Sequence, residues 1–196
     1  MHINVHFGIG VIIASIFNYL FRFTFLEYFL VLMGAFICDF DIFFSKYALE
    51  NNHRLLITHS VIPGVFILII GLIFNLFFVI LSGLNYIIHI IIDTFDWGTN
   101  LFYFQKKQVG LKLLISKEEF DNISKYLEEY KNPQSFFDER YYGCKVCVIL
   151  EALVFIIMIF CLVFFAMGFF IVILIYFVFL AFHLYNHFLL KKIESQ

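Results

Sequence analysis

The stretch Val146–Leu190 reads VCVILEALVFIIMIFCLVFFAMGFFIVILIYFVFLAFHLYNHFLL and is apolar along almost its whole length. A single transmembrane helix needs about 20 apolar residues, so this run is too long for one span. Gly168 lies near its middle, where a glycine favours a turn. The stretch therefore predicts two membrane helices that form a hairpin.

The composition of the whole chain agrees with a location in the membrane. Of its 196 residues, 63% are hydrophobic and only 14% are charged, whereas ordinary soluble domains are about 45–50% apolar and about 25% charged. A small water-soluble protein has too little interior to bury this excess, so the lipid bilayer is the expected partner of the chain. No basic stripe with interleaved aromatic residues appears, which excludes a nucleic-acid partner.

Four further apolar segments in the first half of the chain predict membrane helices. They are Phe7–Phe21, Phe23–Cys38, Val61–Leu81 and Tyr86–Phe95. Arg22 marks a tight turn between the first two, and the polar or small residues Ser82, Gly83 and Asn85 mark a turn between the last two. Together with the C-terminal hairpin they predict an all-α fold, a polytopic membrane helix bundle of about six helices.

The chain divides into three expected parts. Residues 1–98 hold the membrane helices that carry the polar motifs, residues 99–145 form a short cytoplasmic helical insert, and residues 146–196 form the C-terminal hairpin. In the insert, Ser116 and Glu119 have the spacing of a capping box, and Pro133 is expected to end the helix that follows. We expect this amphipathic helix to act as a packed connector; the alternatives are that its apolar face rests on the membrane surface or covers a site as a lid.

Counting helices places every larger polar segment on one side of the membrane. Arg22 is the only basic residue on the far side. The other 12 of the 13 basic residues are on the shared side: Lys46, Arg54, Lys106, Lys107, Lys112, Lys117, Lys125, Lys131, Arg140, Lys145, Lys191 and Lys192. The positive-inside rule then predicts a multi-pass protein of the cell (inner) membrane with this side in the cytoplasm.

The strongest local signal for chemistry is His89-Ile-Ile-Ile-Asp93. Residues four apart lie on one face of a helix, and Asp96 adds a third polar group on nearly the same stripe. Ionisable residues in an apolar helix are costly and are usually functional or paired. Imidazole and carboxylate are good ligands for zinc and similar ions. The simpler alternative is that His89 and Asp93 only hydrogen-bond to each other.

Three other polar groups lie at the ends of the predicted helices. His6 begins the first helix, and Asp39-Phe40-Asp41 ends the second. The segment His53-Arg54-Leu-Leu-Ile-Thr58-His59-Ser60 precedes the third. Taken singly, each of these could be a solvated helix end or an interfacial loop. Helix counting brings all of them, with His89 and Asp93, to the same membrane face.

This convergence predicts a divalent-metal site, with zinc as the expected cation and one or more ions bound. The expected ligands are His6, Asp39, His53, His59, His89 and Asp93. Asp41 or Asp96 could orient a ligand or act as general base, and Arg54 is a fixed cation suited to a phosphate. Mixed nitrogen and oxygen ligands fit hydrolysis by a metal-activated water.

The order of these motifs resembles the YdjM-like (DUF457) family of predicted inner-membrane, metal-dependent hydrolases. The matching residues are His6, Asp39-Phe40-Asp41, His53 to Ser60, and His89 to Asp93 followed by Gly98. Cys38 stands where that family has a proline, and the His-Arg motif is one residue longer. The resemblance implies a membrane-bound hydrolase, more distantly similar to zinc-dependent phospholipase C, and therefore a phosphoester or lipid-linked substrate.

Two weaker candidates and two competing functions stay open. Cys144 and Cys147 have metal-ligand spacing but no second pair, and His183 and His187 share a helix face and could add ligands. A transporter could line its path with the same polar residues, although transporters tend to bind near the midplane and often contain repeats. The metal site could also serve only to hold the helices together in a structural membrane protein.

Overall fold

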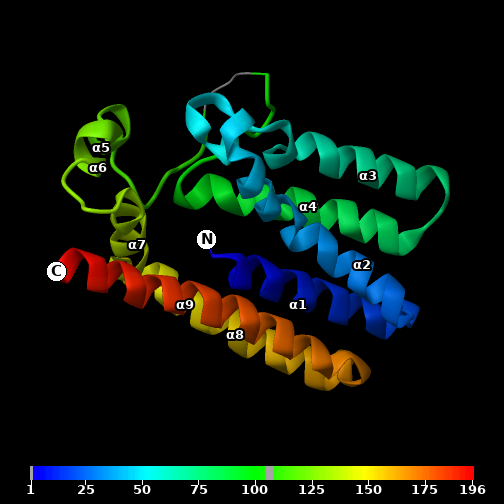
Figure 1. The fold of residues 1–196 in the computed structure, drawn as a ribbon. Coiled ribbons are helices and arrows are strands. Elements are labelled where there is room, and N and C mark those ends of the chain that lie inside the picture. The colour runs from blue at the N-terminus through cyan, green and yellow to red at the C-terminus, as the bar shows by residue number, and fades with distance from the viewer. Residues whose placement is uncertain (1, 105–107) are drawn as a thin grey trace.

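The computed structural model describes residues 2–104 and 108–196 (Figure 1). Within these residues every regular element is a helix and none is a strand, which confirms the all-α class. Six apolar helices form the bundle: α1 (Ile3–Phe21), α2 (Phe25–Phe36), α3 (Val61–Ile73), α4 (Phe77–Asp96), α8 (Lys145–Phe165) and α9 (Ile173–Ser195). All except α3 belong to the five helical segments that are long and apolar enough to cross a membrane.

The first hairpin forms as predicted. Arg22 caps α1 in the left-handed conformation (φ 51°), which reverses the chain. Thr24 and Glu27 then form a capping box at the start of α2: Thr24 accepts from the amide of Glu27, and the Glu27 carboxylate accepts from the amide of Thr24. The exposed carboxylate of Glu27 therefore lies at the hairpin end and caps the helix.

The second predicted turn is wrong. Ser82, Gly83 and Asn85 lie inside α4, and the chain reverses earlier, at Asn75 (φ 52°). Gly83 is needed for helix contact instead: a Cβ there would lie 2.6 Å from the backbone nitrogen of Leu68 in α3. The Asn85 amide donates to the carbonyl of Val31 in α2 at 2.9 Å. Small and hydrogen-bonding residues thus mark a close crossing of membrane helices.

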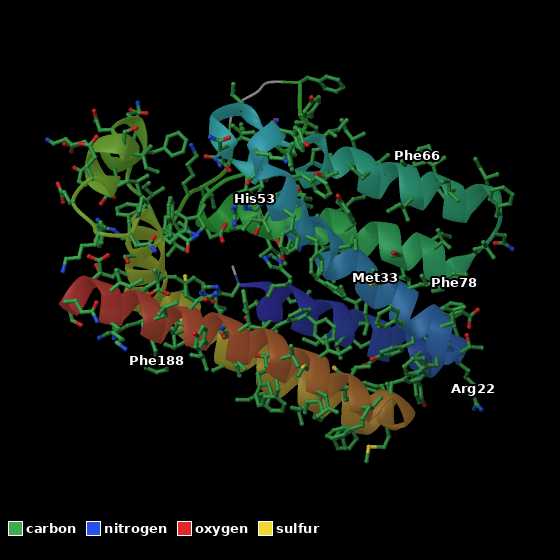
Figure 2. All side chains as sticks on the ribbon, viewed as in Figure 1. Arg22, Met33, His53, Phe66, Phe78 and Phe188 are labelled. Atoms are coloured by element: carbon green, nitrogen blue, oxygen red, sulfur yellow. The ribbon has the colours of Figure 1, made fainter. Side chains whose placement is uncertain are left out.

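The C-terminal hairpin confirms the turn expected near Gly168. Helix α8 ends at Phe165, the short 3-10 helix η5 (Met167–Val172) contains Gly168, and α9 follows directly. In Figure 1 this turn lies at the same end of the bundle as the turns after α1 and α3. Both ends of the chain and helices α5 to α7 lie toward the other end. Figure 2 likewise shows Arg22 at the turn end and His53 at the opposite end.

The predicted helix of the insert is divided. Ser116 and Glu119 form the expected capping box, but α5 (Lys117–Asp121) and α6 (Ile123–Leu127) are separated at Asn122. Pro133 was expected to end the helix and instead begins α7 (Pro133–Gly143). The fixed φ of proline suits the first helical position, where no backbone hydrogen is needed. Pro133 therefore marks the start of a helix, whereas the prediction had it mark the end of one.

The lengths of the helices create the place for the polar motifs. At about 1.5 Å per residue, the 12 residues of α2 and the 13 residues of α3 span only about 18 and about 20 Å. Helices α1 and α4, with 19 and 20 residues, approach the thickness of a hydrocarbon core, about 30 Å. The 3-10 helices η1 (Ile37–Tyr47), η3 (His53–Leu55) and η4 (Ile57–His59) occupy the space that α2 and α3 leave.

Helix α1 lies in the middle of the bundle and packs against α2 on one side and α8 on the other (Figure 1). Its core residues Phe7, Val11 and Ala14 are completely buried, together with Leu32 of α2 and Met158 of α8. The first turns of α1 therefore contact α2 on one face and α8 on another. His6 lies in these first turns.

Candidate metal centre

Four parts of the chain bring histidines and aspartates together at the polar end of the bundle. Helix α1 supplies His6, η1 supplies Asp39, η4 supplies His59, and α4 supplies His89 and Asp93. We call these five residues the inner cluster. His6, His59, His89 and Asp93 are all at most 1% exposed, so their polar atoms must find partners within the protein.

The carboxylate of Asp93 is at the centre of the inner cluster. Its Oδ2 lies 2.8 Å from Nε2 of His59 and 3.6 Å from Nε2 of His89. Its Oδ1 lies 3.1 Å from Nε2 of His6. Nε2 of His89 is also 3.3 Å from Oδ1 of Asp39. Three imidazoles therefore direct the same nitrogen, Nε2, at two carboxylates.

Hydrogen bonds behind the cluster orient two of the imidazoles. Nδ1 of His89 lies 2.7 Å from the carbonyl oxygen of Ala35. A carbonyl oxygen only accepts, so Nδ1 carries the hydrogen and Nε2 keeps its lone pair. Metal-binding histidines are commonly oriented in this way. His59 differs, because both of its nitrogens face carboxylates: Nδ1 lies 3.1 Å from Oδ2 of Asp41 and Nε2 lies 2.8 Å from Oδ2 of Asp93.

Several of these atoms lack hydrogen bonds although they are close together. Among the described residues, neither Nε2 of His6 nor Nε2 of His89 has a hydrogen-bond partner, and both atoms are buried. Ligand atoms about 2.1 Å from one ion are about 3.0 Å apart in an octahedron and about 3.4 Å apart in a tetrahedron. The separations of 3.1, 3.3 and 3.6 Å are close to this spacing. Possible ligand atoms of Asp39, His59, His89 and Asp93 all lie within 4.8 Å of one another, so these four residues could hold a cation, with His6 beside them.

The imidazole of His59 is flanked by the carboxylates of Asp41 and Asp93. Burial disfavours the charged imidazole, but hydrogen bonds to Asp41 and Asp93 outweigh the burial and raise the pKa of His59 above its ordinary value. Nε2 of His59 lies 2.8 Å from Oδ2 of Asp93. An imidazole that binds a divalent cation must give up the proton on the coordinating nitrogen.

A second group surrounds Asp41, next to the inner cluster. Asp41 lies 2.8 Å from Nδ1 of His53 and accepts a hydrogen bond of 2.8 Å from the hydroxyl of Thr58, in addition to its contact with His59. The structure therefore places His53 on Asp41 instead of among the inner ligands. Possible ligand atoms of Asp41, His53 and His59 lie within 4.8 Å of one another, which is compatible with a second cation position.

Arg54 and Asp96 lie at the edge of the inner cluster. Nη1 of Arg54 donates to Oδ1 of Asp96 and to the carbonyl of Gly98, each at 3.2 Å. Nη2 lies 3.5 Å from Oδ2 of Asp93. Asp96 also accepts from the amide of Trp97 at 2.6 Å. Asp96 thus anchors Arg54, and Arg54 brings a fixed positive charge beside Asp93.

Three residues that the motif analysis did not single out hold the segment Arg54–His59 in place. The hydroxyl of Tyr86 donates to the carbonyl of Thr58, and the hydroxyl of Thr99 donates to the carbonyl of His59 at 3.0 Å. The amide of Asn100 donates to the carbonyl of Arg54 at 3.2 Å. Tyr86 is three residues before His89, so its position on the same helix face was the available signal.

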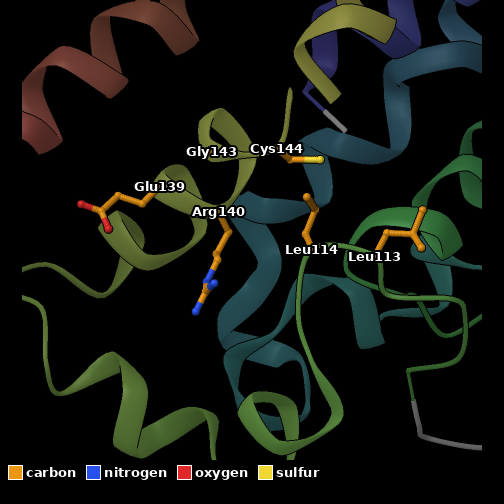
Figure 3. Close-up of a pocket in the computed structure, with 6 residues that line it drawn as sticks. All are labelled: Leu113, Leu114, Glu139, Arg140, Gly143 and Cys144. Carbon is orange, nitrogen blue, oxygen red and sulfur yellow. The ribbon is translucent and has the colours of Figure 1, made fainter. Parts of the chain in front are cut away.

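The weaker candidates lie elsewhere. His183 contacts Tyr142 and Glu151, and His187 lies 2.5 Å from Asp138, so both belong to the packing of α7, α8 and α9. Cys144 and Cys147 are free thiols. Cys144 lines an open cavity of about 280 Å³ (Figure 3), and none of the inner-cluster residues lines that cavity.

The inner cluster combines buried imidazoles with separations close to those between metal ligands. No protein-family model, curated protein or solved structure matches the chain.

Proposed function

We propose that the protein is a membrane-bound, divalent-metal-dependent hydrolase of a phosphoester or lipid-linked substrate. The observation that carries the proposal is the group Asp39, His59, His89 and Asp93, whose possible ligand atoms all lie within 4.8 Å of one another. Nε2 of His6 lies 3.1 Å from Asp93 beside this group, and the Nε2 atoms of His6 and His89 are buried without hydrogen bonds. Burying such groups without a partner is costly, and a bound cation removes the cost.

Zinc is the cation that this donor set suits best, because it favours imidazole and carboxylate ligands. His6, His59 and His89 would supply nitrogen, and Asp39 and Asp93 would supply oxygen. When bound, the cation would lower the pKa of a coordinated water and polarise a phosphoryl or carbonyl oxygen. Asp41 would hold the tautomer of His59, and its second oxygen already orients His53.

The proposed substrate class follows from Arg54. A guanidinium beside the cation matches the geometry and charge of a phosphate group. The side chains of Asp39 and His53 are 23% and 22% exposed, whereas those of His59 and Asp93 are completely buried. A substrate would therefore reach the centre from the side of Asp39 and His53.

The charge distribution and the motif order support the cellular setting of this proposal. Helix counting from the sequence assigns 12 of the 13 basic residues to the side of the polar segments, which favours the cytoplasmic face of the cell membrane. Two of them, Lys106 and Lys107, lie outside the described residues. We also propose that the protein belongs to the YdjM-like family. This proposal rests only on the order of the motifs, which are His6, Asp39, Asp41, the segment His53–Ser60 and His89 to Asp93.

One observation favours a second candidate function. The complete burial of His59 and Asp93 is typical of cations that hold elements together, since structural sites are closed and catalytic sites keep an open position. In that case the centre would tie α1, α4 and the 3-10 segments to one another without turnover.

The first test is the metal content of the detergent-purified protein, measured by elemental mass spectrometry. We expect a stoichiometric divalent cation in the wild type and its loss in a His89→Ala/Asp93→Ala double variant that still folds. The matched control is His187→Ala, which removes a buried imidazole outside the centre and should keep the cation. A wild type without cation, even after reconstitution, would overturn the proposal.

A second measurement separates the two candidate functions. The metal-loaded protein is assayed on a panel of phosphoesters and phospholipids beside Arg54→Ala. Hydrolysis that falls in Arg54→Ala while the cation is retained would support the hydrolase. A full complement of cation with no turnover on any member of the panel would favour the structural role.

A further inference from the structure

A second buried polar network lies in the C-terminal half, centred on Glu151. This glutamate is in α8, an otherwise apolar helix, and its side chain is only 14% exposed. A carboxylate in such a position is costly, and when present it is usually paired and functional. The proposed hydrolase chemistry does not use it.

The carboxylate of Glu151 joins four helices. Its Oε1 accepts from the amide nitrogen of Asn4 in α1 at 2.7 Å and lies 3.2 Å from Nε2 of His183 in α9. Its Oε2 accepts from the hydroxyl of Tyr141 in α7 at 2.7 Å. Asn4 is completely buried, and its amide also lies 3.4 Å from the hydroxyl of Tyr176 in α9.

Asn4 connects this network to the metal centre through helix geometry. Asn4 and His6 are two residues apart, which is about 200° around an α-helix. They therefore project from nearly opposite faces of α1. Asn4 meets Glu151 of α8, while His6 stacks on His89 of α4, with ring centroids 3.8 Å apart. The rotation of α1 about its axis decides both contacts together.

We propose that Glu151 is a positioning residue for the metal centre: by holding Asn4, it fixes the rotation of α1 that aims His6 at the cation. This inference rests on the proposed function and gives the C-terminal hairpin a part in it. His6 needs such support from behind, since neither of its ring nitrogens has a hydrogen-bond partner among the described residues. His59 and His89, by contrast, are oriented through their own Nδ1 atoms.

The test is a double-mutant cycle between Glu151 and His6, read out as the affinity for Co²⁺ and the visible d–d spectrum of the bound ion. We expect Glu151→Gln to weaken Co²⁺ binding about tenfold, the lower end of effects seen for residues behind metal ligands. Its spectrum should move toward that of His6→Ala. In the His6→Ala background, Glu151→Gln should change the affinity by less than about twofold, because the two act through one ligand.

Two further variants keep the result interpretable. Asn4→Ala removes the link from the side of α1 and leaves the Tyr141 and His183 contacts of Glu151, so it should reproduce the effect even if Glu151→Gln folds poorly. Tyr28→Phe is the matched control: it breaks another buried hydrogen bond of α1, the 2.8 Å contact with Ser15, and should leave the affinity and the spectrum unchanged.

The outcomes separate this inference from the proposed function. A wild type that binds Co²⁺, with Glu151→Gln and Asn4→Ala indistinguishable from Tyr28→Phe, would overturn the positioning role and leave the metal centre standing. The positioning role would also be overturned if Glu151→Gln lowered the Co²⁺ affinity by the same factor in the wild-type and the His6→Ala backgrounds. The effect would then be a general destabilisation of the protein. A wild type that binds no cation would overturn both.

Discussion

Asp41 interacts with three side chains, and each contact constrains the metal centre from outside. It accepts a hydrogen bond from Thr58, orients His53, and lies 3.1 Å from Nδ1 of His59. The sequence placed Asp41 near the motif histidines, but it could not show which nitrogen of His59 the carboxylate faces. That choice depends on the 3-10 path of η1, which apolar periodicity does not predict.

The amide variant Asp41→Asn tests this control at the level of one residue. Its amide nitrogen would turn a donor toward one of the three side chains and release the tautomer of His59, so we expect metal affinity to fall about 10- to 100-fold. Competition with a chromophoric chelator measures the change. Asp138→Asn is the matched control, because Asp138 pairs with His187 outside the centre. Equal affinities in the two variants would contradict the role given to Asp41.

At the scale of elements, the turn between α3 and α4 shows where sequence reasoning reached its limit. Gly83 and Asn85 have the residue types of a turn, yet both lie within α4 at helix crossings. A glycine in an apolar segment permits either a reversal or a close approach, and only the partner helix decides between them. The His89-Asp93 spacing was more informative, because an i,i+4 pair keeps its meaning wherever the helix begins.

The variant Gly83→Ala tests the crossing of α3 and α4. Its Cβ would come within 2.6 to 2.9 Å of backbone atoms of Gly64 and Leu68, so the helices must separate. We expect a loss of about 1–3 kcal/mol in the free energy of unfolding, measured by thermal unfolding in detergent. The control is Gly168→Ala, where an added Cβ meets no atom within 4 Å. A Gly83→Ala protein as stable as this control would show that α3 and α4 are not in such close contact.

The start of the insert gives an element-scale prediction about pH. The pKa of Glu119 is lowered from its ordinary value of 4.5, because its carboxylate accepts hydrogen bonds at the Ser116 cap and pairs with Arg140. A group with a lowered folded-state pKa stabilises above its unfolded pKa, and the stabilisation is lost as pH falls through the folded value. The protection of the amides at the start of α5 against hydrogen exchange, relative to their intrinsic rates at each pH, should therefore fall below pH 4.5 more in the wild type than in Glu119→Gln. Equal pH dependence in both would contradict this.

At the scale of the whole molecule, the short helices α2 and α3 explain why the polar motifs gather where they do. Both end short of the polar end of the bundle, and 3-10 segments carrying Asp39, Asp41, His53 and His59 fill the remaining space. Irregular backbone at such a depth is tolerated where it is buried in protein. Hydropathy predicted the bundle and its shared polar end, because both depend on composition. Hydropathy overestimated the length of α3, which ends at Ile73 and not at Leu81. A hydropathy window of about 19 residues does not resolve where the chain turns within a continuous apolar run.

The shared polar end makes one prediction about the protein in its membrane. Single cysteines at exposed positions on either end, introduced after the four native cysteines are replaced, should label from opposite sides with a membrane-impermeant reagent. Lys46→Cys and Lys125→Cys belong to the side of the metal centre, and Arg22→Cys and Asn75→Cys belong to the turn side. The positive-inside rule assigns the first pair to the cytoplasm, so in intact cells only the second pair should react. Labelling of Lys46→Cys and Lys125→Cys from opposite sides would refute the arrangement itself. If Lys46→Cys and Lys125→Cys both reacted from outside, the protein would have the opposite orientation, with the metal centre on the outer face of the membrane.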